Sequence, residues 1–137
     1  MWFQKEIRLP AFKRGFHLIT QHITKNVGIL PSVGCMHVFI KHTSAALTLN
    51  ENADPSVRVD FETTMNKIIP ENQAQFTHTL EGDDDMPAHL KSSIIGSSVT
   101  IPISGNRINL GTWQGIYLCE FRDQGGSREI VITVFGE

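Results

Sequence analysis

The chain has 137 residues, of which 12 are Lys or Arg and 14 are Asp or Glu, giving a formal net charge of −2. This length fits one domain that buries about two-thirds of its unfolded surface, so folding needs neither a disulfide nor a structural metal. The basic residues are scattered among acidic ones, whereas nucleic-acid binding requires clustered positive charge. The composition therefore argues against a nucleic-acid partner.

Nothing in the chain resembles a targeting or membrane segment. Residues 1–6 lack the basic and apolar regions of a signal peptide, and no apolar stretch reaches the roughly 18 residues of a membrane span. Cys35 and Cys119 lie far apart in apolar runs without C-x-x-C spacing, which predicts two reduced, buried thiols. We therefore expect a cytoplasmic protein with no membrane partner.

The first half of the chain predicts strands around one helix. Residues 2–9 alternate between apolar and polar side chains, which is typical of a half-exposed strand. Residues 16–27 carry apolar side chains at spacings of three and four, which predicts a helix. Residues 35–42 alternate again and place His42 at the edge of the core, and residues 45–49 predict a second short strand.

The second half begins with a helix that Asp54 caps, with Pro55 at its first position, and that Pro70 ends. A polar loop over residues 71–82 and a short helix over residues 86–95 follow. Four strands are then expected, of which the last two are apolar on both faces and therefore central: residues 98–103, 107–110, 115–121 and 129–135. Residues 1–137 thus predict a single compact α+β domain, with mixed or mostly antiparallel sheets flanked by about three helices.

The segment 78–89 is the densest polar region, with two histidines and four carboxylates. Asp85 and His89 are four residues apart, on one side of the predicted helix. Imidazole suits Zn and carboxylate suits Mg, so the mixture favours a divalent cation. The alternative is an ordinary acidic helix start, since acids stabilise a helix amino terminus. Three adjacent acids, however, repel one another unless a positive group lies nearby.

His42 and Glu120 are isolated polar residues, and the role of each has two interpretations. His42 is either a hydrogen-bonded histidine at the core edge or the rim of a pocket. Glu120 follows Ile116 and Leu118 on one face of an apolar strand. A carboxylate there needs a partner, because an unpaired buried charge is very costly. Either an arginine such as Arg122 or Arg128 pairs with Glu120, or Glu120 takes part in the chemistry of a functional site.

Two glycine-rich segments are also ambiguous. Trp113 and Gln114 stand between glycines, which allows close approach of a ligand to the backbone and offers a stacking face, although a plain turn with a core tryptophan fits too. The segment 125–128 offers backbone N–H groups and the cation of Arg128 to an anion, but a hairpin loop explains it equally well.

Taken together, three segments resemble the YjbQ family, identified as secondary thiamine-phosphate synthases, in the family's order and over nearly the whole chain. They are His-Thr-Ser-Ala-Ala-Leu at 42–47 with Asn50-Glu51, the acidic stretch 81–89, and Gly-Thr-Trp-Gln-Gly at 111–115 running into Cys119-Glu120-Phe121. The resemblance implies a compact α+β fold assembled as a homotrimer. It also implies a divalent metal, Zn or Mg, near His42, His78 and His89.

The activity implied by the resemblance joins a hydroxymethylpyrimidine diphosphate to a thiazole phosphate and releases diphosphate. We therefore expect a metal-assisted enzyme that acts on a phosphorylated small molecule. The residues expected to contact the substrate are Trp113, Gln114, Thr43, Ser44, Arg107 and Arg128. The candidates for a general base are Glu120, Glu51 and Asp85. The alternative is a protein that binds a metabolite through the same metal without turnover.

Overall fold

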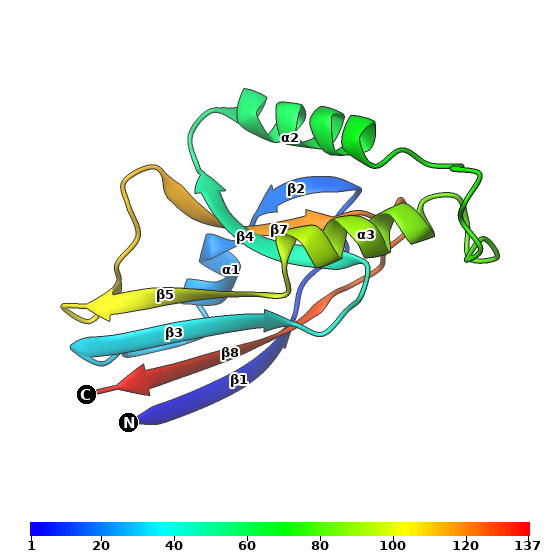
Figure 1. The fold of residues 1–137 in the computed structure, drawn as a ribbon. Helices are drawn as coiled ribbons and strands as arrows, with labels where there is room; N and C mark the ends of the chain where they lie inside the picture. Colours follow the sequence, from blue (N-terminus) through cyan, green and yellow to red (C-terminus); the bar gives the residue numbers. More distant parts are fainter.

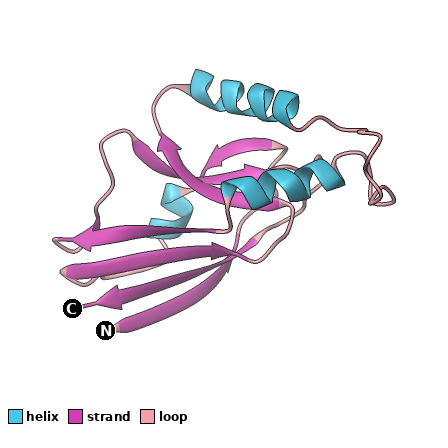
Figure 2. Ribbon diagram, viewed as in Figure 1, coloured by secondary structure: helices cyan, strands magenta, loops and turns pink.

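The computed structural model describes residues 1–137 as one α+β domain with eight strands and three helices (Figures 1 and 2). The helices are α1 (Thr20–Thr24), α2 (Pro55–Ile68) and α3 (Asp85–Ile95). The strands are β1 (Trp2–Arg8), β2 (Gly15–Leu18), β3 (Val33–Ile40), β4 (Ala45–Glu51), β5 (Ser98–Ser104), β6 (Arg107–Ile108), β7 (Gln114–Glu120) and β8 (Glu129–Gly136).

The strands form two sheets, and every neighbouring pair is antiparallel. The larger sheet has the order β1-β8-β3-β5-β6, and the smaller one has the order β2-β7-β4. Helices α2 and α3 lie over the small sheet, on its side away from the large sheet (Figure 1). The molecule therefore has three layers: the large sheet, the small sheet and the pair of helices. No helix covers the outer face of the large sheet.

Two apolar clusters hold these layers together. The larger cluster lies between the sheets and has 17 buried residues, among them Ile116 and Leu118 of β7. The smaller cluster lies between the small sheet and the helices, and it takes Tyr117 and Cys119 from the same strand. Strand β7 is apolar on both faces because each face is buried in a different cluster. This confirms its predicted central position.

The predicted helix over residues 16–27 is wrong. Residues 15–18 form strand β2, which pairs with β7, and only Thr20–Thr24 is helical. Phe16 belongs to the small cluster, whereas Ile19 and Ile23 belong to the large one. A strand followed by one helical turn therefore produces the same spacing of apolar residues as a longer helix does.

The helix predicted after Asp54 is present, and the Asp54 side chain accepts a hydrogen bond from the Ser56 N–H, as a cap should. Strand β6 ends at Ile108, earlier than expected. Both cysteines are free, but Cys35 is only half-buried, whereas burial raises the pKa of the fully buried Cys119 thiol. None of the helices is long and apolar enough to cross a membrane.

Candidate metal-binding site

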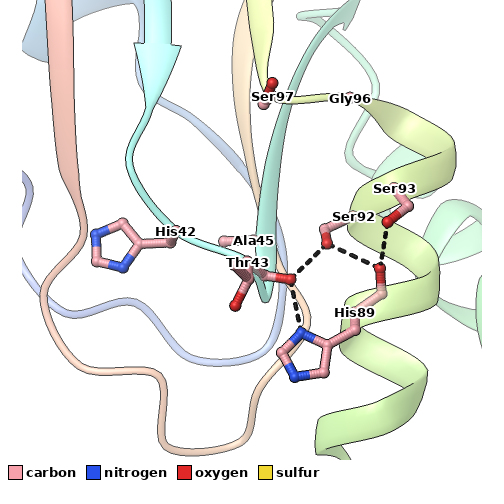
Figure 3. Close-up of a pocket in the computed structure, with 8 residues that line it drawn as sticks. All are labelled: His42, Thr43, Ala45, His89, Ser92, Ser93, Gly96 and Ser97. Carbon is pink, nitrogen blue, oxygen red and sulfur yellow. Dashed lines mark hydrogen bonds between the residues drawn. The ribbon is translucent and has the colours of Figure 1, made fainter.

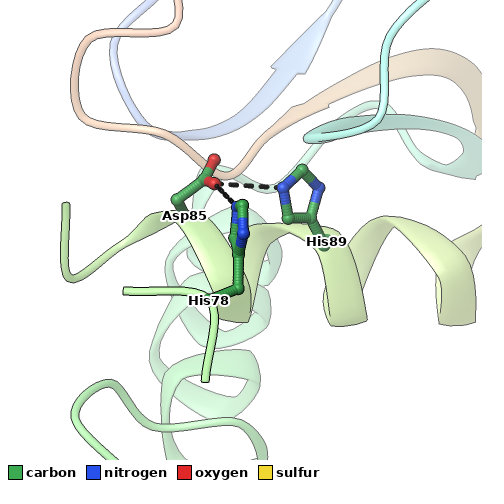
Figure 4. A group of neighbouring side chains, drawn as sticks. All are labelled: His78, Asp85 and His89. Atoms are coloured by element: carbon green, nitrogen blue, oxygen red, sulfur yellow. Dashed lines mark hydrogen bonds and ion pairs between the residues drawn. The ribbon is translucent and has the colours of Figure 1, made fainter. Parts of the chain in front are cut away.

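Three side chains converge at the start of α3 (Figure 4). Asp85 is the first residue of the helix, His89 follows one turn later, and His78 reaches in from the preceding loop. The Asp85 Oδ2 atom lies 2.8 Å from His78 Nε2 and 3.1 Å from His89 Nε2. Two imidazole nitrogens and one carboxylate oxygen form a donor set that suits a divalent transition metal.

The backbone fixes the orientation of the His89 ring. Its Nδ1 atom lies 2.9 Å from the Thr43 carbonyl oxygen, which can only accept a hydrogen bond, so Nδ1 carries a proton. In a neutral ring the Nε2 atom is then bare, and it faces the carboxylate of Asp85. Two lone pairs at this distance repel unless a positive charge stands between them. Either a second proton on the ring or a metal ion satisfies this geometry.

Arg122 holds the acidic residues from the opposite side. Its Nη1 donates to Asp85 Oδ1 at 2.6 Å, and its Nε donates to Asp84 Oδ2 at 2.9 Å. Burial opposes ionisation of Asp85, but hydrogen bonding from His78 and the charges of His89 and Arg122 outweigh it and lower the pKa of Asp85. Asp85 therefore remains a carboxylate, and the expected positive group beside the acidic run is Arg122.

A polar hollow of about 320 Å³ adjoins His89 (Figure 3). Its lining includes Thr43 and the serines of the last turn of α3, and it contains no Lys or Arg. The complete lining is His42, Thr43, Ala45, His89, Ser92, Ser93, Gly96 and Ser97. A small ligand in this hollow would lie beside the three converging side chains and would meet hydroxyl groups rather than cations.

His42 lines the hollow but does not belong to the converging group. Its Nε2 accepts a hydrogen bond from the backbone N–H of Glu129 at 2.8 Å, so this nitrogen is already used. Burial and the positive charge of Arg128 lower the pKa of His42. The structure thus replaces His42 with Asp85 as the third donor and leaves His42 as a rim residue.

Glu120 and Arg128 form a buried ion pair, which corrects their expected roles. Glu120 is fully buried, and Arg128 reaches both of its oxygens, at 2.7 Å from Nε and 2.5 Å from Nη2. Arg128 also donates to Ser44 Oγ at 2.9 Å. Glu120 is not free to act as a base, because both of its oxygens are paired, and most of the hydrogen bonds of Arg128 go to Glu120 and Ser44 rather than to a ligand.

Other expected site residues lie at the opposite end of the small sheet. Ala45 pairs with Glu120 at one end of β4, and Glu51 pairs with Gln114 at the other end. The two pairs are six residue steps apart along β4, roughly 20 Å at about 3.3 Å per step. Gln114 lines a second hollow of about 410 Å³ there, and the neighbouring Trp113 is exposed. Within one chain these three residues do not reach His89.

Arg107 is also remote from the cluster. It pairs with Ser104 at the far end of β5, whereas Ser97, just before the start of β5, lines the hollow beside His89. The side chain of Arg107 is exposed and is not available to a ligand at the histidines of the same chain. The sequence interpretation missed the serines of α3 and the pairing of Arg122 with Asp84. Only the repulsion within the acidic run pointed to such an arginine.

The fold and the cluster define a single-domain α+β protein with a candidate metal site. The family model described as UPF0047 protein YjbQ-like matches residues 5–137. A YjbQ protein from Salmonella typhimurium is 51% identical over the full length of both chains, and one from Escherichia coli O157:H7 is 48% identical over the same extent. The chain therefore belongs to the YjbQ (UPF0047) family.

Solved structures agree with this fold. A YjbQ/UPF0047 family protein from Clostridium acetobutylicum is 37% identical, with a TM-score of 0.83 over 96% of this chain and 99% of its own. A Sulfolobus solfataricus protein described as YbjQ-like and of unknown function has a TM-score of 0.85 over 100% of this chain and 99% of its own. At 24% identity, the second comparison bears on the fold alone.

The ion pair between Glu120 and Arg128 generates a prediction. Replacing Glu120 with Gln leaves the Arg128 charge buried without a counter-ion, and breaking such a pair costs roughly 3–5 kcal/mol. We expect the Glu120→Gln variant to unfold at a clearly lower temperature and to keep the metal content of the wild type. Thermal denaturation and elemental analysis of one preparation measure both. A variant of wild-type stability contradicts the structural role.

Proposed function

We propose that the protein is a metal-assisted enzyme acting on a phosphorylated small molecule, and that it forms thiamine phosphate from a hydroxymethylpyrimidine diphosphate and a thiazole phosphate. The observation that carries the proposal is that His89 Nε2 faces the Asp85 carboxylate, which His78 also contacts, while His89 Nδ1 is taken by the Thr43 carbonyl. His78, Asp85 and His89 would hold the ion. We place the protein in the cytoplasm, since both of its cysteines are unpaired.

The absence of Lys and Arg from the lining of the hollow suits a reaction in which a metal ion binds the leaving group. A bound divalent ion would neutralise the departing diphosphate, which no Lys or Arg of the hollow can do. The thiazole nitrogen that attacks the methylene carbon carries no proton, so the new C–N bond forms without a general base. This requirement matches a site in which the carboxylates of Glu120 and Asp85 are both engaged.

A second function is a protein that captures a metabolite through the metal without turnover. The observation that favours it is the same engagement of the carboxylates, together with the distance of Glu51 from the hollow. Such a site offers no free carboxylate to a reaction that needs proton transfer. Binding and turnover must therefore be measured on one preparation.

The metal site predicts a difference among the histidines. We expect the wild type to retain a divalent ion and the His78→Ala and His89→Ala variants to lose it, because each removes one of the three converging donors. The His42→Ala variant should keep the ion, since His42 lies outside this group. His22→Ala, in the second hollow, is the matched control. Elemental analysis after exhaustive dialysis measures the metal content of each variant. Equal metal content in the wild type and His89→Ala would contradict the proposed site.

The activity predicts thiamine-phosphate formation by metal-loaded wild type from the two phosphorylated substrates. Diphosphate release should match the product one to one. Activity should fall to background in metal-free protein and in His89→Ala, and rescue of a thiamine-requiring strain should follow the same pattern. Calorimetry with inorganic diphosphate separates the alternatives: binding without product formation supports the non-catalytic function, and neither binding nor product contradicts both.

We also propose that the chain assembles as a homotrimer through the outer face of the large sheet. Strand alternation and register place four rows of side chains on this face, and no helix covers them. Charged side chains gather at one end of this face, where Arg8 pairs with Glu129 and Glu6 pairs with Lys41, and the rest of the face carries no acidic or basic group apart from His37. The rows are Trp2-Phe135-Cys35-Pro102, Gln4-Thr133-His37-Thr100, Glu6-Val131-Phe39-Ser98 and Arg8-Glu129.

The assembly predicts that one charge in this face separates the subunits. A lysine at Phe135 would lie between Trp2 and Cys35, away from Glu6, and an unpaired charge in an apolar contact is costly. We expect the wild type to have three times the chain mass of 15.3 kDa in light scattering, and Phe135→Lys to have the mass of one chain. Thr63→Lys, on the exposed side of α2, is the control and should remain assembled. A wild-type mass of one chain contradicts the proposal.

A further inference from the structure

Asp85 presents only one oxygen to the histidines, because Arg122 occupies the other. We propose that Arg122 is a positioning residue that determines which metal the site accepts: by locking Asp85 Oδ1, it makes the site prefer zinc-like transition metals over magnesium and calcium. The inference rests on the proposed metal site and goes beyond it, since it assigns selectivity to a residue that does not touch the ion.

Four contacts fix the Arg122 side chain and the backbone from which it projects. Its own N–H donates to Glu120 Oε2 at 3.2 Å, which ties it to the buried ion pair. Its Nη2 donates to the Glu81 carbonyl at 2.9 Å, and its Nε and Nη1 bind Asp84 and Asp85. The Asp123 N–H donates to Asp84 Oδ2 at 2.8 Å, so the carboxylate that binds the Arg122 guanidinium is also held in place by the backbone.

The planar guanidinium cannot release one carboxylate without disturbing the others. Asp85 is buried, and its Oδ1 is held at 2.6 Å, so the carboxylate cannot turn to offer both oxygens to an ion. Calcium favours several oxygen donors, including bidentate carboxylates, and magnesium favours oxygen donors and water. One carboxylate oxygen beside two imidazoles suits zinc and similar ions instead.

The charge of Arg122 acts in the same direction. Asp84 and Asp85 would together attract any dication, and hard cations depend most on such negative charge. The guanidinium offsets part of that charge at a distance of one hydrogen bond from each acid. With this charge offset, the selectivity of the site depends mainly on the imidazole nitrogens of His78 and His89, which favour transition metals.

The competing interpretation is that Arg122 only neutralises two buried acids and stabilises the fold. Both interpretations predict lower stability when Arg122 is replaced, so stability does not separate them. Metal selectivity and the ligand field of a bound cobalt ion do, because these depend on how many Asp85 oxygens face the ion. Arg122→Lys keeps the positive charge, but its single nitrogen cannot contact both Asp84 and Asp85. Arg122→Met removes the charge and both hydrogen bonds.

The experiment compares wild type, Arg122→Lys and Arg122→Met, with Arg8→Met as a control that removes an exposed arginine from β1. Zinc, calcium and magnesium affinities are measured by competition titration, and visible absorption is recorded for the cobalt-loaded proteins. We expect zinc affinity to fall about 10–100-fold in Arg122→Met, as is usual when a partner of a metal ligand is lost. Calcium affinity should stay level or rise, the cobalt bands should weaken, and Arg122→Lys should be intermediate.

The outcomes separate this inference from the metal site itself. If the wild type binds no metal, the proposed site fails and the inference fails with it. If the wild type binds zinc and a folded Arg122→Met variant keeps the same zinc-to-calcium ratio and the same cobalt spectrum, the site stands and the inference is overturned. If Arg122→Met does not fold, Arg122→Lys decides by the same two measurements.

Discussion

The buried ion pair between Glu120 and Arg128 is the interaction on which the rest of the structure depends. Glu120 ends β7, Arg128 precedes β8, and Ser44 precedes β4, so the pair joins the two sheets where they meet. A Cβ atom at Gly125 would lie 2.2 Å from Glu120 Oε1, so the loop between β7 and β8 passes directly over the carboxylate. Glu120 also accepts a hydrogen bond from the Arg122 N–H and thereby fixes the backbone of the residue whose side chain holds Asp85.

The features that the sequence predicted correctly are those with a local cause. Asp54 and Pro55 define a helix start within two residues, and alternation identifies the strands because side chains on a strand repeat every two residues. The pairing of Asp85 with His89 follows from helical spacing alone. The structure places His78 beside Asp85 and His89, although its loop has no regular structure from which a position could be derived.

The features that the sequence could not determine depend on contacts between distant segments. Two partners were open for Glu120, and the choice of Arg128 over the Arg122 side chain depends on how the loop after β7 folds back. Trp113 and Gln114 are predicted substrate contacts because the flanking glycines allow a ligand to approach the backbone and tryptophan offers a stacking face. The antiparallel register of β4 and β7 separates them from the histidines, since it places Glu51 and Gln114 at one end and Glu120 at the other.

Helix α3 has opposite polarity at its two ends, and the candidate site uses both. Its first residue, Asp85, lies at the end where the helix dipole is positive, whereas the serines of its last turn line the hollow. An anion in the hollow meets the negative end of the dipole and no Lys or Arg, so a cation held beside His89 would strengthen its binding. Thermodynamic linkage makes this gain mutual: the anion strengthens the binding of the cation by the same factor.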